Sequence, residues 1–421
     1  MKLTALAILA VLLALLVVPC QAAPRNAAEY SGNPKIVDVL YISRMILQGQ
    51  SSHTVIAADP AIEVLPVPMP SLYAITWLGQ KPEMVNRILR LYMPRNYQDL
   101  LDHRDMVILY EAPCGALGSS SIRFDPKWMD WFVRFVEEDG RPLEMWGGDA
   151  SWGGGGEGAY TSWGDTLLDE ILPYECLGGY TPYHAGSFKP HFFDQDHPLS
   201  RLPWRPGLLE LFNKVKPKLG AEQIAEAVGP NTHIPWLAMR KAGKGLVLGD
   251  TQVFYSAGTT DRMVREWQWY QDFLVYLVYL GAGKPVPEDL YRVHRLREEI
   301  NGHRSKESLF VGLLEFVDKF GGKTAQLYSE MEAIDEEEKK AEDYFRMDDY
   351  DSAEEAFQEI AAAWEELNAK AIKVKNRALM WVYLVEWFSV TGVALVAGVT
   401  LWVVMVRRRL YREVRTTRTF G

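Results

Sequence analysis

Cysteine is scarce in this sequence. Only three cysteines occur among 421 residues, and Cys20 lies in an N-terminal apolar segment. Three cysteines are too few for a fold held together by disulfides. The sequence leaves open whether Cys114 and Cys176 pair, because spacing along the chain does not fix the distance between two Cα atoms.

Positive charge is also in short supply, with a formal net charge of −10 at pH 7. Binding to nucleic acid needs a basic face that neutralises phosphates, so this charge excludes nucleic acid as the expected partner. No GxGxxG motif follows the first predicted strand, 35–43, so no dinucleotide cofactor is expected. We predict no cofactor of any kind.

A compact metal-binding motif is missing as well. The spacing of the nearest candidates fits no zinc motif, and we predict no metal site. The alternative role for Asp196 and His197 is to satisfy backbone groups of their own loop. The candidates that we considered are His184, His191, Asp194, Asp196 and His197.

Long apolar runs do occur, one at each end of the chain. Lys2, the apolar run 3–18 and the small residues Ala22 and Ala23 predict a signal peptide over 1–23. The alternative is an uncleaved anchor helix. The second run, 387–406, has no charge and forms the core of a predicted transmembrane helix over 379–406.

The flanks of the second run predict its orientation. Arginines 407, 408, 409, 412, 415 and 418 make 407–421 a basic tail, which places the C-terminus in the cytoplasm. Basic residues at 370, 373, 375 and 377 on the other flank weaken this asymmetry. With the export signal, the pattern predicts a single-pass protein of the cell membrane whose N-terminal domain is extracytoplasmic.

Residues 30–283 read as an α/β domain. The strand 35–43 is apolar on both faces, which is typical of a central parallel strand. A second buried strand, 106–110, precedes an amphipathic helix over 125–138 and a strand over 143–146. We further expect a strand region over 53–68, a helix over 160–171, an irregular segment over 176–204, strands over 234–239 and 245–248, and one helix over 262–280.

A glycine-rich loop, GGDASWGGGG, follows the strand 143–146. In doubly wound sheets ligand sites form at the carboxyl ends of strands. The loop amides would then cradle an anion, although the alternative is that the glycines only allow a tight bend and close packing. The candidate ligand-binding residues are Gly147, Gly148, Asp149, Ser151 and Trp152, with Glu111 and Asp250 after neighbouring strands.

Five segments carry a family resemblance. They are HRDMVILYEAP (103–113), RPLEMWGGDASWGG (141–154), TLLDEILPYE (166–175), DHPLSRLPW (196–204) and GKGLVLGDTQ (243–252). In order and spacing they resemble the class I glutamine amidotransferase-like superfamily, specifically the putative glutamine amidotransferase branch of membrane-anchored prokaryotic proteins. The resemblance implies a flavodoxin-like, doubly wound sheet.

The resemblance also implies a lost active site. Active members carry a cysteine at the turn, where this chain has 147–150, and a histidine near the last strand, where this chain has 248–252. The remaining catalytic candidates are Cys114, Asp149 and His184. A cysteine nucleophile needs a base within hydrogen-bond reach, and the alternative for Cys114 is a packed thiol or a disulfide.

The C-terminal third is predicted to be helical, with a connector over 284–322 and an acidic hairpin stalk over 323–378. Residues 330–366 hold 16 acidic and 3 basic residues. A heptad stripe runs from Ala353 to Ala378, and Ser352 with Glu355 predicts the cap of its helix. No proline or glycine cap separates this helix from the transmembrane segment, so one long helix is expected.

The first stalk helix is too short to cover that stripe. The sequence therefore predicts that 367–378 is left bare within the chain and meets another helix, in a homodimer or with another membrane or envelope protein. The predicted function is a non-catalytic binding or scaffolding module, a pseudoenzyme of an envelope complex. The alternatives are a hydrolase or amidotransferase-like enzyme using Cys114 or Asp149, and a glycan-binding ectodomain with exposed tryptophans.

Overall fold

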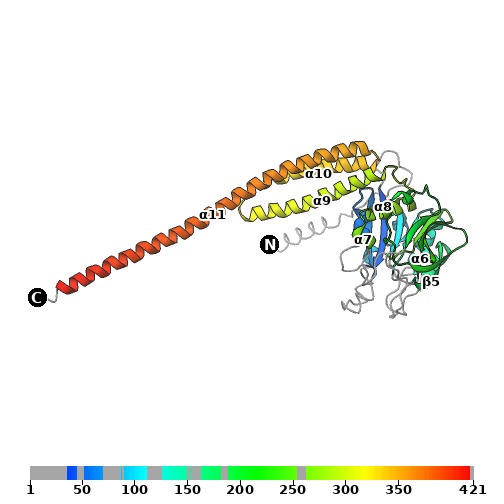
Figure 1. The fold of residues 1–421 in the computed structure, drawn as a ribbon, viewed down its shortest axis with the longest axis horizontal. Coiled ribbons are helices and arrows are strands. Elements are labelled where there is room, and N and C mark those ends of the chain that lie inside the picture. The colour runs from blue at the N-terminus through cyan, green and yellow to red at the C-terminus, as the bar shows by residue number, and fades with distance from the viewer. Residues whose placement is uncertain are drawn as a thin grey trace, which may run out of the picture. The chain divides into compact units, whose positions relative to one another are not determined.

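The computed structural model describes residues 36–44, 52–69, 87, 90–110, 126–148, 152, 163–181, 188–253 and 262–417. The chain divides into two compact units, Met1–His294 and Arg295–Gly421. Figure 1 colours the first unit from blue to green and the second from yellow to red. The predicted signal peptide lies outside the described residues.

The first unit is built on an eight-stranded mixed sheet. Its first five strands in spatial order are parallel neighbours, and the last three extend the sheet in antiparallel fashion. In that order the strands are β2 (Ile62–Met69), β1 (Val37–Arg44), β3 (Met106–Tyr110), β4 (Leu143–Trp146), β10 (Gly245–Asp250), β9 (Thr232–Ala242), β8 (Ala221–Gly229) and β6 (Lys189–Phe192).

Apolar side chains of the central strands are buried on both faces of this sheet, as the pattern of 35–43 predicts. Tyr41 and its face belong to one core cluster, whereas Leu40 and Ile42 belong to another. The first cluster packs under α8 (Tyr270–Gly281) and the second under α6 (Pro126–Glu137). The sheet is thus the middle layer of an α/β unit; the finer flavodoxin-like assignment stays a prediction.

Four local expectations are wrong. The region 53–68 begins as the helix α2 (Ser52–Ala57), which contacts α8, because a short apolar run does not distinguish helix from strand. The helix expected over 262–280 is split into α7 (Arg262–Glu266) and α8, and between them Trp267 packs on Trp204 with ring centroids 4.5 Å apart.

The segment 176–204 also has regular structure. It contains most of β5 (Tyr174–Tyr180), which pairs with β7 (Asn213–Pro217), and all of β6, which pairs with β8. These partners are distant in sequence, so local periodicity does not reveal them. In the described part of 160–171 two short 3-10 turns, η1 (Trp163–Asp165) and η2 (Leu167–Glu170), replace the expected α-helix.

The second unit is a three-helix bundle instead of a hairpin. Its helices are α9 (Leu290–Lys319, from Arg295 onward), α10 (Ala325–Arg346) and α11 (Tyr350–Thr417). Phe310 of α9 packs edge-on against Trp364 of α11, with ring centroids 5.5 Å apart. The predicted connector is therefore a structural member of the stalk.

The bundle overturns the prediction of a bare stripe over 367–378. Leu367, Ala371 and Ala378 are all buried, with Ala378 7% exposed. The ion pair of Lys370 with Glu330 shows that α10 runs beside this part of α11, and α9 packs on α11 through Phe310 and Trp364. The structural argument for a partner helix along this stripe is removed.

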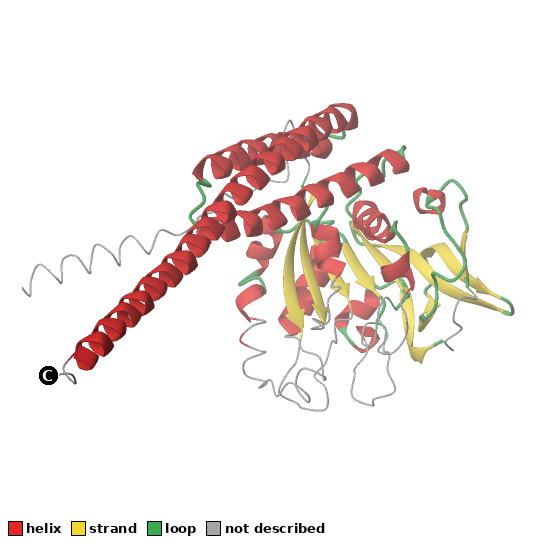
Figure 2. Cartoon of the chain, turned by 60° about the vertical axis from the view of Figure 1, so that its left-hand side comes forward, coloured by secondary structure: helices red, strands yellow, loops and turns green. Residues whose placement is uncertain are grey.

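The helix α11 is continuous from Tyr350 to Thr417 and leaves the bundle as a lone helix (Figures 1 and 2). Among the described residues it is the one helix long and apolar enough to cross a membrane. Its cap differs from the expectation: Asp349, rather than Ser352, accepts a hydrogen bond at the start, from the Ser352 amide at 3.2 Å. The preceding Asp348 has a φ of 62°, a conformation that short polar residues tolerate.

Candidate functional site at the carboxyl edge of the sheet

The carboxyl ends of β4 and β10 are joined through Asn213, a fully buried residue at the start of β7. Its side chain accepts from the Gly148 amide at 3.0 Å and donates to the Gly148 carbonyl at 2.9 Å. Its own amide donates to the Thr251 carbonyl at 2.8 Å. One asparagine thus satisfies backbone groups of two strand ends, and the Gly148 amide already has a partner within the protein.

Glycines at this edge allow the two backbones to approach closely. A Cβ at Gly147 would overlap the carbonyl oxygen of Gln252, and a Cβ at Gly249 would lie 2.8 Å from Pro173 and 3.1 Å from Trp152. The Trp152 indole covers Gly249 and donates to the Asp250 carbonyl at 2.8 Å. The contacts therefore indicate that these glycines allow close packing.

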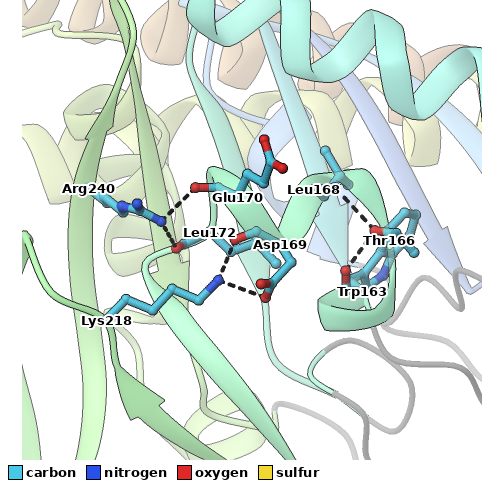
Figure 3. Close-up of polar contacts among 8 residues, drawn as sticks. All are labelled: Trp163, Thr166, Leu168, Asp169, Glu170, Leu172, Lys218 and Arg240. Atoms are coloured by element: carbon cyan, nitrogen blue, oxygen red, sulfur yellow. Dashed lines mark hydrogen bonds and ion pairs between the residues drawn. The ribbon is translucent and has the colours of Figure 1, made fainter.

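The chain after the glycine-rich loop is tied to the neighbouring strands by two basic side chains, as Figure 3 shows. Arg240 of β9 donates to the carbonyls of Glu170 and Leu172 at 2.7 and 3.0 Å. Lys218 binds the carboxylate of Asp169 at 2.7 Å and also donates to its carbonyl. These contacts fix the chain where it enters β5.

Two carboxyl groups are buried beneath the edge, on neighbouring strands. Glu144 Oε2 accepts from the Trp146 indole at 2.8 Å, and Asp250 Oδ1 accepts from the Trp236 indole at 3.1 Å and from the Gln252 amide at 2.7 Å. Both residues are fully buried. The other oxygens, Glu144 Oε1 and Asp250 Oδ2, have no hydrogen-bond partner among the described residues.

Burial controls the protonation of this pair. It raises the pKa of Glu144 to about 8; the Trp146 hydrogen bond opposes the rise and the nearby Asp250 adds to it. Burial likewise raises the pKa of Asp250 to about 8, against the hydrogen bonds from Gln252 and Trp236. Both groups are therefore largely protonated at neutral pH.

The buried pair is suited to holding the core together. A protonated carboxyl donates one hydrogen bond and accepts others, and these two hold indoles in place without contact with solvent. Perturbed carboxyls often mark functional sites, but catalysis on an external substrate needs access. Glu144 also leaves no room at Gly281 of α8, where a Cβ would overlap Glu144 Oε1.

The sequence-predicted site residues divide into two groups. The structure brings Gly147, Gly148, Trp152 and Asp250 together within one hydrogen-bonded and packed cluster. Trp152 and Asp250 are fully buried within it. The remaining candidates lie outside the described residues: Glu111, Cys114, Asp149, Ser151 and His184.

The two described histidines considered for metal binding, His191 and His197, make other contacts. His197 Nδ1 accepts from the Leu199 amide at 3.3 Å and caps the short turn Pro198–Arg201, as expected for a loop-satisfying residue. Asp194 accepts from the Asp196 amide at 2.9 Å. The His191 ring lies against Phe193. No cluster of three potential metal ligands occurs among the described residues.

Sequence reasoning missed Glu144 and Asn213. The signal for Glu144 is an acidic residue inside the otherwise apolar strand LEMW, because a charged residue in a buried strand must be neutralised or paired. Asn213 carries no comparable signal, since its two partners lie 38 and 65 residues away in the chain.

No family model matches this chain, and no curated protein matches it significantly. Among solved structures, it is similar to cytoplasmic proteins STM3548 and STM1381 of Salmonella typhimurium. STM3548 gives 13% identity, a TM-score of 0.44 and coverage of 58% of this chain and 98% of the other. STM1381 gives 17%, 0.40, 58% and 99%.

A further similar structure is Agd3, described as a carbohydrate deacetylase, with 12% identity, a TM-score of 0.35 and coverage of 59% of this chain and 33% of the other. These TM-scores, all below 0.5, assign neither activity nor substrate to this chain. None of the three descriptions mentions an amidotransferase, so the resemblance seen in the sequence stays a prediction.

Proposed function

We propose that this chain is a membrane-anchored, extracytoplasmic binding or scaffolding module without catalytic activity. The proposal is supported by the polar groups at the described strand ends, which form hydrogen bonds within the protein. The Gly148 backbone bonds to Asn213, the Asp250 carbonyl to Trp152, and the two carboxyls to indoles. The backbone groups are already hydrogen-bonded inside the protein, and the two carboxyls are fully buried, so neither set is poised to bind or activate an external substrate.

The anchoring part of the proposal depends on α11. Its residues beyond the bundle are apolar and exposed, and six arginines follow the apolar run. Exposed apolar surface on this scale is covered by lipid in proteins that span a membrane. The arginines favour a cytoplasmic C-terminus, and the apolar N-terminal segment favours export of the first unit.

Topology is tested with protease added to intact cells and to spheroplasts. Digestion of the large N-terminal part, with a small C-terminal fragment left in the membrane, is the expected result. Protection of the whole chain until the membrane is permeabilised would contradict the proposed orientation. An antibody tag after Gly421 and a second tag in the exposed β8–β9 turn, at 230–231, distinguish the two ends.

The enzyme alternative is tested on the full-length protein with glutamine, esters and amides as substrates. We expect the wild-type protein to show no more turnover than an Asn213→Ala variant. That variant lacks the side chain that joins the ends of β4 and β10. Turnover abolished by Cys114→Ala or Asp149→Asn, with unchanged folding by circular dichroism, would establish the enzyme instead. Turnover that persists unchanged in both Cys114→Ala and Asp149→Asn would indicate a contaminating enzyme.

The glycan-binding alternative receives no support from the tryptophans. Stacking on a sugar needs an exposed ring face. Among the seven tryptophans considered for this role, five are buried: Trp128, Trp146, Trp152, Trp163 and Trp236. Trp204 is half-buried and packs against Trp267 and Phe273.

A further inference from the structure

The basic residues on the bundle side of the apolar span are not explained by the predicted membrane orientation, because they weaken the charge asymmetry that favours it. Lys373, Lys375 and Arg377 precede the span on α11, and Lys319 and Lys323 flank the turn between α9 and α10. The body of the bundle, by contrast, is strongly acidic between Glu330 and Glu366. The charge of the second unit therefore changes sign along its axis.

Contacts within the bundle bring these two basic groups to the same level. Lys370 of α11 binds Glu330 of α10 at 2.9 Å. The two helices are antiparallel, so six residues back along α10, at Thr324, correspond to six residues forward along α11, at Asn376. The burial of Ala378 agrees with this register. Figures 1 and 2 both show the α9–α10 turn beside α11 where α11 leaves the bundle.

This end of the bundle, the basic tip, comprises residues 316–324 and 373–378. Besides its five basic residues it contains one acid, Asp318, whose side chain accepts from the Thr324 hydroxyl. It also exposes two aromatic rings, Phe316 and Phe320, which are 42% and 38% exposed and contact each other with centroids 4.7 Å apart. Exposed aromatic rings among lysines are typical of a membrane–water interface.

The membrane span places the tip at the lipid surface. Residues 379–406 are roughly 42 Å long at about 1.5 Å per residue, which matches a bilayer of about 40–45 Å with its headgroups. The level of Thr324 and Asn376 is then within about 5 Å of the headgroup layer. Lysine side chains reach such a distance along their apolar stems.

We propose that the basic tip binds anionic lipid headgroups, so that the bundle rests on the bilayer that α11 crosses. The acidic body is repelled by the same surface, which favours contact through the tip alone. A basic residue near an anionic membrane contributes about 1 kcal/mol, a factor of about five in binding. The proposal depends on α11 spanning the membrane but not on which side the bundle occupies.

The test uses the full-length protein in two kinds of nanodisc. One contains phosphatidylcholine alone, and the other also contains about 40% phosphatidylglycerol, which makes the lipid surface anionic. Acetylation of individual lysines is followed by mass spectrometry. Tip lysines 319, 323, 373 and 375 should react about fivefold more slowly in the anionic discs. Lys339 and Lys340, which are exposed on the acidic body, should react equally in both.

Charge-reversal variants distinguish the basic tip from the body of the bundle. In Lys319→Glu/Lys323→Glu the difference at Lys373 and Lys375 should shrink, whereas the matched body variant Lys339→Glu/Lys340→Glu should keep it. Equal reaction of the tip lysines in both lipids overturns the proposal. So does protection that is independent of lipid and appears only with two copies per disc, since a second copy then covers the tip. Failure to enter discs at all contradicts the anchor instead.

Discussion

In the α/β unit, Glu144 and Asp250 are buried beside indole N–H groups, whereas in the helical bundle Glu342 is half-buried between two arginines. Glu342 binds Arg304 at 2.8 Å and Arg346 at 2.9 Å. Glu144 and Asp250 tolerate burial because their raised pKa values keep them protonated, whereas Glu342 forms ion pairs with Arg304 and Arg346. Loss of a proton near neutral pH should therefore weaken the arrangement of Glu144 and Asp250.

One bundle residue resembles the α/β pair. Glu338 interrupts the apolar stripe of α10 and is 9% exposed. Burial raises its pKa to about 7, and the neighbouring acids Glu342, Glu307 and Asp335 add to the rise while Arg304 opposes it. The bundle thus contains a paired acid and a poorly paired acid one helical turn apart.

The largest expected effect is that of Glu144→Gln on the α/β unit. Folded protein keeps a proton on Glu144 that unfolded protein releases, so the free energy of unfolding falls as pH rises from about 4.5 to about 8. That interval corresponds to at most roughly 5 kcal/mol at about 1.36 kcal/mol per pH unit. Glutamine keeps the acceptor for Trp146 and cannot ionise, so it should stabilise the unit at pH 8.

Urea unfolding followed by tryptophan fluorescence between pH 5 and 8.5 measures this effect. Asp250→Asn should act in the same direction, since the pKa of Asp250 is also raised to about 8. Glu137→Gln, the same chemical change on an exposed residue of α6, is the matched control. A pH slope that Glu144→Gln and Glu137→Gln leave equally steep would refute the buried, protonated state.

Gly147→Ala should have the next largest effect. The added methyl group meets the Gln252 carbonyl and neighbouring backbone, which cannot yield without separating β4 from β10. We expect a loss of about 2–3 kcal/mol in the free energy of unfolding, as for other overpacked sites. Hydrogen exchange should locate the loss in β4, β10 and β7, and exchange in α10 should be unaffected.

Glu338→Leu should stabilise the bundle by about 1–2 kcal/mol at pH 8. It replaces a costly carboxylate with an apolar side chain on an apolar stripe. Glu338 destabilises the wild-type bundle by this route only above the ordinary carboxyl pKa, where the unfolded chain ionises. The gain from Glu338→Leu should therefore shrink as pH falls below about 7. Hydrogen exchange of α10 at pH 6 and 8 tests this, with exposed Glu337→Leu as control; equal gains from both variants would contradict a special role for Glu338.

The smallest expected effect is that of Gly302→Ala in α9. Apart from the backbone of its own helix, no atom lies within 4 Å of the new Cβ, so the higher helix propensity of alanine is the main contribution. A gain of about 0.5–1 kcal/mol is expected in the protection of α9 amides. Gly147 is required by a close approach of two backbones, and Gly302 is not. A loss at Gly302 would mean that α9 is bent there.

Much of this fold is readable from the sequence because its central strands are short apolar runs. The strands β1, β3, β4, β9 and β10 and the helix α6 lie close to their predicted positions. The continuity of α11 was also predicted, from the absence of proline and glycine between the heptad stripe and the apolar run. These features depend on local composition.

Features that depend on distant partners were not predictable. The antiparallel extension by β8 and β6 is stabilised by pairing across the chain, and β6 alone shows little periodicity. The packing of α9 on α11, seen at Phe310 and Trp364, is hard to predict because α9 also carries a second, outward set of apolar residues, such as Leu309, 76% exposed. Two competing stripes obscure which face is inside.

The same limit applies to the candidate site. Gly147, Gly148, Trp152 and Asp250 lie together, since carboxyl ends of adjacent parallel strands must meet at one edge, and their role in ligand binding stays a prediction. Their state was not predictable: the contacts of Asp250 come from Trp236 on the neighbouring strand β9, and the bridge through Asn213 comes from β7. A pattern in sequence places residues at an edge but does not say whether solvent reaches them.

The unbroken α11 helix fixes a rotational phase between the bundle and the tail. Each residue of an α-helix turns the chain by about 100° and advances it by about 1.5 Å. Deleting one residue between Leu379 and Glu386 would therefore turn the arginines at 407–409 by about 100° around the axis relative to the bundle. Deleting seven would restore the facing to within about 20° while shortening the span by about 10 Å. The binding of a partner that contacts both the bundle and the tail would therefore vary periodically with the number of deleted residues. With a flexible linker in place of the helix, no such periodicity would be expected.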